Sequence, residues 1–341
     1  MATVTLSDAK GAPAGERFAP ILVATRGEPG SDGAIELAFA LAGATGSPVR
    51  VLAAVVPGPA GPPQLEVPIQ HSSDDLEGVA LLQRRVDAQL RRLGRPGMVR
   101  RIATDIRIGD APSLIVRVAR EVGSRLILLG MAEHNNVVNR LCGAGTAARV
   151  ARAADVPLMV VPRGCGQLPE SALIAVDFSD VSVRAGRVAL TLFPDLDVIH
   201  LVHVAPSPQP SLELVASSEG RFVESAEQAF NEVRDALPLS ACTIVGRELV
   251  RGSPVRELLR VARERRVDLI VAGSHGDGAL HRLLVGNVAT GLLRAARVPV
   301  LVLPTRGRAA NPTVGAYAAS QGRFSARHDR GASVRETLTS R

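Results

Sequence analysis

The chain repeats itself at a distance that fits a whole domain. The string RVARE occurs at residues 117–121 and again at residues 260–264, an offset of 143. Gly130 recurs as Gly273 at the same offset. The units of solenoid proteins run only about 20 to 50 residues, so a repeat of this length indicates a duplicated domain. With 341 residues, the chain is long enough for two domains that each bury a core.

Short apolar runs alternate with helical patterns in both copies. The first copy has five runs typical of buried strands, and five runs of the second copy match them in order. They are residues 21–25, 49–56, 102–108, 126–129 and 157–161, then 173–176, 198–204, 243–250, 269–272 and 300–303. Helices are expected at residues 34–42, 74–93, 112–122, 146–154 and 288–297. This order predicts an α/β fold of two tandem open, mostly parallel five-stranded sheets with flanking helices, which is a Rossmann-like arrangement.

A glycine-rich segment lies between the fourth and fifth strands of the second copy. Its glycines, Gly273, Gly276 and Gly286, are spaced G-x2-G-x9-G and are followed by Asn287. Glycine lets the backbone approach a ligand closely. A helix that starts here would aim free N–H groups and the positive end of its dipole at an anion such as phosphate. The spacing alone is a weak signal in a chain with 32 glycines, and its position between two strands strengthens it.

This segment resembles the nucleotide-binding signature of the universal stress protein family, which is G-x2-G-x9-G followed by Ser or Thr. Asn287 departs from the usual hydroxyl residue, although its amide can still donate a hydrogen bond to a phosphate oxygen. The resemblance covers residues 18–163 and 171–304. It implies an adenine nucleotide alpha-hydrolase-like fold and a ligand that is ATP, with or without magnesium.

The resemblance also implies roles for individual residues of the second copy. Residues 175–179 read AVDFS and resemble the family's V-D-x-S, which implies that Asp177 contacts the adenine. Val204 matches the position that packs near the base. The three glycines would approach the ribose and phosphates, and Asn287 and Val288 would supply donors at a helix start. The residues themselves leave alternatives open: Asp177 as a turn or cap residue, Val204 as plain core, and the glycines as simple turns.

The first copy keeps the first glycine of the motif as Gly130 but departs from the motif elsewhere. Arg26 stands where the second copy has Asp177, and Glu133 stands at the second glycine. Arginine cannot accept a hydrogen bond from an adenine amine, and a carboxylate opposes phosphate binding. The first site is therefore predicted to be degenerate, so that the chain binds one nucleotide. A loop shift in which Gly145 and Thr146 restore the motif is the open alternative.

No catalytic constellation is evident in the sequence. His200 and His203 are three residues apart on an expected strand and face opposite ways, which argues against a shared metal ion. We identify no Ser-His-Asp order, acid pair or metal cluster, so we expect neither catalytic residues nor metal ligands and do not expect an enzyme.

The positive charge gathers at the end of the chain. The formal net charge is +7, and residues 305–341 hold seven Arg against Asp329 and Glu336, which accounts for five of the seven charges. Disorder is expected for this basic tail, and a nucleic-acid-binding fold is not implied. Aromatic residues make up only 2% of the chain, which leaves little surface for stacking bases.

Cysteine content and hydropathy bear on the compartment. Cys142, Cys165 and Cys242 are odd in number and widely spaced, which is typical of free thiols in a reducing compartment. The first residues lack the apolar core of a signal peptide, and no stretch of 18 apolar residues could cross a bilayer. The sequence therefore predicts a cytoplasmic protein without a membrane partner.

These observations predict a domain layout. Residues 1–17 form a flexible arm, 18–163 a first domain, 164–170 a linker, 171–304 a second domain and 305–341 the basic tail. Single domains of the family pair through their last strands. The resemblance therefore implies an internal pseudo-dimer of the two domains and leaves a further homodimer open.

The resulting interpretation is a tandem universal stress protein that binds ATP in its second domain and acts as a nucleotide-responsive stress regulator on an unknown protein partner. Two alternatives remain. One is a nucleotide-independent protein-interaction scaffold of the same fold. The weaker one is a slow ATPase.

Overall fold

The computed structural model describes residues 19–56, 73–94, 102–131, 137–205, 216–274 and 287–304. The chain divides into two compact units, Met1–Leu168 and Pro169–Arg341, and the division falls inside the expected linker. The expected arm at residues 1–17 and the basic tail at residues 305–341 lie outside the described residues. The expected pairing of the two fifth strands concerns how the units sit together, and it stays a prediction.

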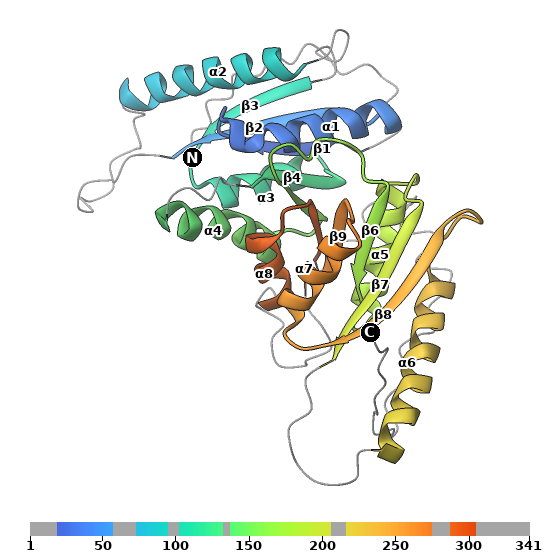
Figure 1. Cartoon of the computed structure of the whole chain (residues 1–341). Helices are drawn as coiled ribbons and strands as arrows, with labels where there is room; N and C mark the ends of the chain where they lie inside the picture. Colours follow the sequence, from blue (N-terminus) through green and yellow to red (C-terminus); the bar gives the residue numbers. More distant parts are fainter. Residues whose placement is uncertain are drawn as a thin grey trace. The chain divides into compact units, whose positions relative to one another are not determined.

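Strands and helices alternate in the first unit (Figure 1). Its strands are β1 Ile21–Thr25, β2 Val49–Val55, β3 Ile102–Ile108, β4 Leu126–Gly130 and β5 Leu158–Val161. Its helices are α1 Asp32–Thr45, α2 Ser73–Leu93, α3 Ala111–Glu121 and α4 Val137–Ala153, with a short 3-10 helix, η1, at Pro29–Ser31. The strand order is β3-β2-β1-β4-β5, and every pairing within it is parallel.

The second unit has the same arrangement (Figure 1). Its strands are β6 Ser171–Ala175, β7 Val198–Ala205, β8 Ile244–Arg251, β9 Leu269–Gly273 and β10 Val300–Leu303. Its helices are α5 Asp180–Leu192, α6 Ala216–Ala236, α7 Pro254–Glu264 and α8 Asn287–Ala295. The strand order is β8-β7-β6-β9-β10, again parallel throughout. The predicted α/β fold with mostly parallel strands in two repeated units is thus confirmed.

Helices cover both faces of the strands in each unit. In the second unit, α5 contacts β6, β9 and β10 and α6 contacts β8, whereas α7 packs on β6, β7 and β8 beside α8. The central strands are therefore buried on both faces and read as unbroken apolar runs, such as residues 269–272. The two cores are built almost entirely from Val, Leu, Ile and Ala.

The strand boundaries lie within two residues of those predicted, and two helix boundaries do not: α1 ends at Thr45, three residues later than expected, and α4 starts early. The helix expected at residues 146–154 is α4, and it begins at Val137, nine residues earlier than expected. The sequence Gly143-Ala144-Gly145 suggested a loop. A glycine in a helix interior costs only about 1 kcal/mol relative to alanine, and burial of Ala147, Ala148 and Val150 offsets that cost.

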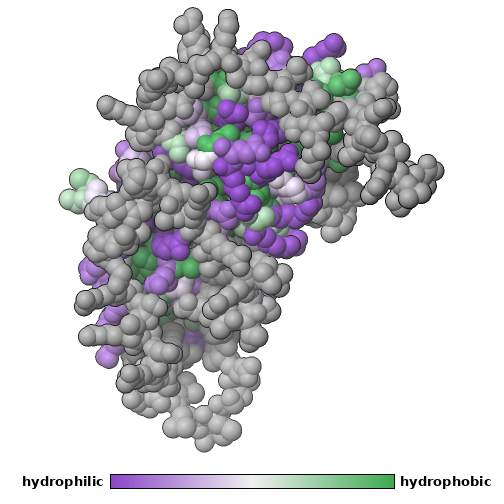
Figure 2. Space-filling model, turned by 180° about the vertical axis from the view of Figure 1, so that it is seen from behind, coloured by the Kyte–Doolittle hydropathy of each residue, from purple (hydrophilic) through white to green (hydrophobic). Residues whose placement is uncertain are grey.

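The surface of the described residues is mixed. Figure 2 shows hydrophobic residues set among hydrophilic ones on the face in view. The large apolar side chains that are exposed in the described parts are Val56, Leu76, Leu81 and Ile244. Within the described residues, none of the helices has both the length and the apolar character to span a bilayer.

Candidate functional site

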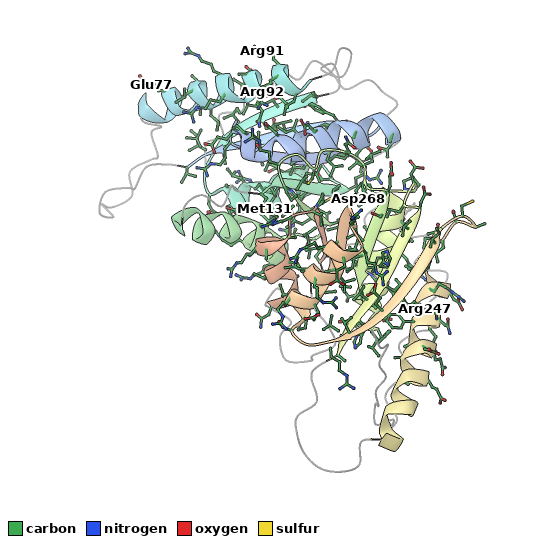
Figure 3. The ribbon with its side chains drawn as sticks, viewed as in Figure 1. Glu77, Arg91, Arg92, Met131, Arg247 and Asp268 are labelled. Carbon is green, nitrogen blue, oxygen red and sulfur yellow. The ribbon has the colours of Figure 1, made fainter. Side chains whose placement is uncertain are left out.

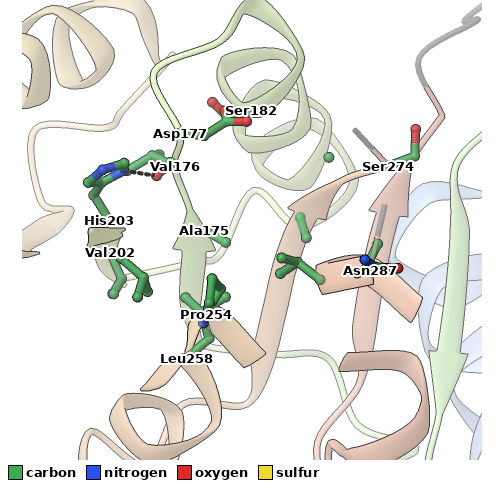
Figure 4. A pocket seen from close by; sticks show the side chains of 15 residues that line it. Ala175, Val176, Asp177, Ser182, Val202, His203, Pro254, Leu258, Ser274 and Asn287 are labelled. Carbon is green, nitrogen blue, oxygen red and sulfur yellow. Dashed lines mark hydrogen bonds between the residues drawn. The ribbon is translucent and has the colours of Figure 1, made fainter. Parts of the chain in front are cut away.

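A pocket opens in the second unit where the strand order changes direction. The chain passes from β6 outward to β7 on one side and returns to β9 on the other, and in open α/β sheets ligands bind at this switch point, beyond the carboxyl ends of the strands. The pocket has a volume of about 210 Å³ (Figure 4). Its walls come from the ends of β6, β7 and β9 and from the N-terminal turns of α5, α7 and α8.

Five of the seven predicted site residues line this pocket. They are Asp177, Val204, Gly273, Asn287 and Val288. They come from three strand ends and one helix start that are far apart in the sequence, and the fold brings them together. The other two, Gly276 and Gly286, lie outside the described residues.

Asp177 both shapes a turn and borders the pocket. Its Oδ1 accepts hydrogen bonds from the backbone N–H of Ser179 at 3.1 Å and from the Ser179 hydroxyl at 2.6 Å. Ser179 in turn caps the start of α5 by accepting from the N–H of Ser182. The side chain of Asp177 is exposed, and its Oδ2 makes no hydrogen bond to a described residue. The turn role that the residues alone suggested is therefore real, and it leaves one carboxylate oxygen available.

The rest of the pocket wall is mainly apolar. Val202 and Val204 contribute from β7, and Pro254 and Leu258 contribute from α7 (Figure 4). Leu258 is almost fully buried, so this wall is part of the packed core. An apolar wall with one acceptor at its edge suits an aromatic ring that carries a polar substituent.

The turn that precedes α7 shapes the pocket wall through its backbone conformation. Gly252 has a φ of 136°, in a region that residues with a side chain rarely adopt. A Cβ at Gly252 would also lie 3.2 Å from Cγ of Glu257. This glycine therefore has a structural role.

Three aromatic rings, which we call the aromatic cluster (Phe178, His203 and Phe230), adjoin the pocket. The ring centroids of Phe178 and His203 are 4.6 Å apart, and Phe230 of α6 meets Phe178 edge-on at 5.2 Å. The Nδ1 of His203 lies 2.7 Å from the carbonyl oxygen of Val176 (Figure 4). Burial lowers the pKa of His203 below its usual value, although the Val176 carbonyl and the Asp177 carboxylate act against this shift. The imidazole is therefore neutral near pH 7, and as a neutral ring it must carry its proton on Nδ1 to donate to this carbonyl.

His200 and His203 have different surroundings, as their spacing predicted. The Nδ1 of His200 lies 3.9 Å from a Glu248 carboxylate oxygen, away from the pocket lining. Among the described residues there is no group of three His, Cys, Asp or Glu side chains that could hold a metal ion.

In the first unit, the switch point of the sheet is filled by the connection between β1 and α1. Ile21 of β1 pairs with Leu126 of β4, and Ala172 of β6 pairs with Leu269 of β9. Because Leu126 and Leu269 are equivalent residues of the repeat, 143 apart, Ile21 is equivalent to Ala172. Five residues further along each chain segment, Arg26 is therefore at the position of Asp177. Six residues separate β1 from α1, at 26–31, but only four separate β6 from α5, at 176–179.

The longer connection forms η1, which packs against the end of β4. A side chain at Gly130 would collide with the carbonyl oxygen of Gly30 and would lie 2.5 Å from Cα of Ser31. The main chain therefore occupies the switch point of the first unit, where the second unit has its pocket.

A buried polar network holds this filled arrangement in place. Gln89 of α2 donates to Asp32 at 2.6 Å and accepts from the hydroxyl of Thr25 at 2.7 Å. Arg92 forms two hydrogen bonds to Asp32, at 2.8 and 2.9 Å, from the last turn of α2 (Figure 3). Burial of Asp32 raises its pKa, but the hydrogen bonds from Arg92 and Gln89 outweigh this effect and hold the pKa below its usual value. Asp32 is thus ionised and paired.

The glycine motif also has no counterpart in the first unit. The connection from β4 to α4 spans residues 131–136, six residues, whereas the connection from β9 to α8 spans residues 274–286, thirteen residues. Gly145 and Thr146, which could have restored the motif by a loop shift, lie inside α4. They therefore do not stand at a helix start, where free N–H groups could meet a phosphate.

Several pocket residues were not predicted from the sequence. Ser182, His203, Pro254, Leu258 and Ser274 line the pocket, and Phe178 and Phe230 pack with His203 in the aromatic cluster behind it. One signal existed for His203, because it directly precedes Val204 at the end of a strand that leads into the site. Phe230 carried no such signal, since its contact depends on how α6 packs.

Open parallel sheets with a switch-point pocket and a glycine-bordered helix start define a class of α/β proteins that bind small ligands at the strand ends. Within that class, the model of the universal stress protein family matches residues 17–162 and again residues 170–304. The chain therefore belongs to the universal stress protein family, and it carries two copies of the family's domain.

Individual relatives agree with this assignment. Universal stress protein MJ0531 of Methanocaldococcus jannaschii is 30% identical over 144 residues, which cover 40% of this chain and 82% of that protein. Universal stress protein Rv2005c of Mycobacterium tuberculosis is 27% identical over 207 residues, which cover 55% of this chain and 64% of that protein. The chain thus matches somewhat less than two thirds of the mycobacterial protein's length.

Solved structures share the fold. A universal stress protein from Archaeoglobus fulgidus aligns with a TM-score of 0.58 at 18% identity and covers 84% of this chain and 98% of its own. A putative universal stress protein from Pseudomonas aeruginosa aligns with a TM-score of 0.55, also at 18% identity, over 90% of this chain and 99% of its own. At this level of identity, the likeness concerns the fold.

Proposed function

We propose that the second unit binds one adenine nucleotide, ATP, in the pocket between β6 and β9. The observation that carries this proposal is the difference between the two units: the switch point holds a pocket in the second, and η1 fills it in the first. Since the two copies share strand order and register, this difference concentrates ligand binding in one of them.

The chemistry of the pocket supports an adenine base. Asp177 Oδ2 is an acceptor without a partner among the described residues, and the exocyclic amine of adenine is a donor. Val202, Val204 and Leu258 offer apolar surface to the ring. The volume of about 210 Å³ is below the roughly 300–1,000 Å³ of sites that enclose a drug-sized ligand, so the pocket takes the base and part of the ribose.

The phosphates would lie toward α8. Asn287 and Val288 begin this helix and line the pocket, together with Gly273 and Ser274 at the end of β9. Backbone N–H groups and the positive end of the helix dipole favour an anion at such a position. The glycine motif that joins β9 to α8 falls mostly outside the described residues, and its sequence fits close approach of the backbone to phosphate.

In this proposal the protein is a nucleotide-responsive stress regulator rather than an enzyme. Bound ATP would order the connection between Gly273 and Asn287 and so change a surface that a partner protein reads. Amide hydrogen exchange measures the ordering directly, and slower exchange in this connection on adding ATP is the expected result. Exchange and partner binding that are both unchanged by ATP would contradict the regulatory role. An assay for phosphate release tests whether binding occurs without turnover.

Substitution at Asp177 tests the site itself. Asp177→Asn keeps an acceptor for Ser179 but exchanges the other oxygen for a donor, so we expect it to weaken ATP binding by roughly 10- to 100-fold. Isothermal titration calorimetry of the whole chain measures the affinity. Arg26→Ala is the matched control, because Arg26 is exposed at the corresponding position of the first unit. An Asp177→Asn protein that binds ATP as tightly as the wild type would contradict the proposal.

A further inference from the structure

The backbone of Phe178 has an unusual conformation at the edge of the pocket. Its φ is 64°, in the left-handed region, where a bulky side chain is strained. The only other described residue with a side chain and a positive φ is Arg266, which follows the end of a helix. Strain of this kind persists only where the surrounding structure imposes it, and it clusters at functional sites.

The contacts of the Phe178 ring account for its left-handed backbone conformation. The ring lies against His203, with a centroid distance of 4.6 Å, and against Phe230, with a centroid distance of 5.2 Å. Phe230 is almost fully buried, and it anchors the cluster to α6. Aromatic pairs at these distances stabilise each other beyond the area they bury.

His203 also holds the residue on the other side of Asp177. The N–H of Val176 donates to the Val202 carbonyl and so continues the pairing of β6 with β7. The carbonyl of Val176 receives its hydrogen bond from a side chain, the Nδ1 of His203, at 2.7 Å. Backbone groups of buried segments need such partners, and the imidazole satisfies this one.

A single imidazole therefore fixes both neighbours of Asp177. It bonds to the main chain of Val176 before it and packs on the ring of Phe178 after it. Asp177 is further held by Ser179, so the direction of its carboxylate follows from the whole turn of residues 177–179.

We propose that His203 is a positioning residue that sets the 177–179 turn, and through it the Asp177 carboxylate, for recognition of the base. His203 itself lines the pocket, and its positioning role is the part exerted through the Val176 carbonyl and Phe178, which the Ser179 amide reports independently of any direct contact with the ligand. This inference rests on the proposed nucleotide site and names a residue that determines its affinity.

The first unit has no equivalent of the His203 and Phe178 contacts, and this difference supports the positioning role. Thr25 corresponds to Val176 in the register, and its partner on β2 is Ala53, whose side chain has no group that could donate to a carbonyl. Gly27 has a φ of 71° at the position of Phe178, so the same left-handed turn exists there without strain and without a ring. The imidazole and the phenyl ring are thus present where the pocket is open and absent where the switch point is filled.

Two substitutions separate the hydrogen bond from the packing. His203→Phe keeps a ring beside Phe178 but removes the donor, and His203→Asn removes the ring but places an amide N–H near the position of Nδ1. If orientation through the hydrogen bond matters, ATP binding weakens about tenfold in His203→Phe and changes less than about threefold in His203→Asn. His200→Phe is the control, since His200 lies on the same strand outside the pocket lining, and it should bind as the wild type does.

Nuclear magnetic resonance of the whole chain supplies a readout that does not depend on ligand. We expect the Nδ1–H tautomer for His203 in the wild type. We also expect a displaced amide resonance for Ser179, whose N–H donates to Asp177, in His203→Phe but not in His200→Phe. A general loss of stability would not be reversed by the asparagine variant.

The outcomes are distinct. Equal ATP affinity in all variants, equal weakening in His203→Phe and His203→Asn, or an unmoved Ser179 amide would overturn the positioning role. If the wild type itself does not bind ATP, the proposed function fails. In that case the tautomer and the Ser179 resonance still decide whether His203 sets the turn.

Discussion

The two oxygens of the Asp177 carboxylate have different surroundings. Oδ1 holds the turn through Ser179, and Oδ2 has no partner among the described residues at the border of the pocket. The sequence left a turn role and a base-binding role as alternatives. The geometry makes them compatible, because a side chain fixed through one oxygen presents the other in a defined direction.

In the first unit, Asp32 differs from Asp177 because both of its carboxylate oxygens are paired within the protein. It is 5% exposed and accepts from Arg92 and Gln89. We expect Asp32→Asn to destabilise the first unit by about 1 to 3 kcal/mol at pH 7, because it removes charge-assisted hydrogen bonds at a buried position. Urea denaturation measures the change, and Asp235→Asn, which alters an exposed ion pair, is the control.

The pH dependence of this effect has a definite sign. The folded-state pKa of Asp32 is lowered, so its stabilising contribution is complete above the ordinary value of 3.8 and is lost as the pH falls through the lower folded-state value. The stability difference between wild type and Asp32→Asn should therefore narrow in acid. A difference that stays constant from pH 7 down to the acid limit of the native state would contradict the pairing.

At the scale of elements, the second helix of each unit supports the connection after the first strand in a different way. In the first unit α2 contributes Gln89 and Arg92 to a polar network, and in the second unit α6 contributes Phe230 to the aromatic cluster. The polar network accompanies a filled switch point, and the aromatic cluster accompanies an open pocket. The length and composition of the connection after the first strand are thus one of the two differences between the sites of the two units, and the connection after the fourth strand is the other.

Helices α3 and α7 end alike but with different residues. After α3, Gly123 has a φ of 64°, and after α7, Arg266 has a φ of 52°. The N–H groups that follow bond back to Ala119 and Ala262, so both ends use the same left-handed termination.

Arg266→Gly should therefore stabilise the second unit by about 0.5 to 1 kcal/mol. The substitution removes the cost of a left-handed non-glycine residue, which exceeds the entropy that the added glycine loses on folding. Urea denaturation followed through a probe in the second unit tests this expectation. Gly123→Ala is the matched reverse variant, and no atom lies within 4 Å of the added Cβ, so its expected loss reflects conformation alone. A destabilised Arg266→Gly protein would contradict this account.

Element type was predictable wherever local pattern decides it. Buried parallel strands are continuous apolar runs, so the ten strands could be located to within about two residues. The start of α4 could not be located, because the packing of Ala147 and Val150 outweighs the low helix propensity of Gly143 and Gly145. The filling of the first switch point depends on three-dimensional contacts between η1 and Gly130, which no local pattern encodes.

At the scale of the whole molecule, the chain is a duplicated universal stress protein whose copies differ at the connections that follow their first and fourth strands. Asp177, Val204, Gly273, Asn287 and Val288 could be named from the sequence because they match motifs of the family, and the switch point of the sheet brings them together. His203 and Phe230 could not, since their contacts depend on the register of β7 and the packing of α6. The strand order determines where the site lies. His203 and Phe230 are proposed to determine the direction of the Asp177 carboxylate within it.

The central claim is that one unit binds nucleotide and the other does not. Native mass spectrometry of the intact chain titrated with ATP measures this stoichiometry most directly. We predict one ATP per chain in the wild type, the same in Arg26→Asp, and an occupancy well below one in Asp177→Asn at ATP concentrations that just saturate the wild type. Two bound nucleotides, or binding that survives in Asp177→Asn and is lost on substitution at Arg26, would contradict the account.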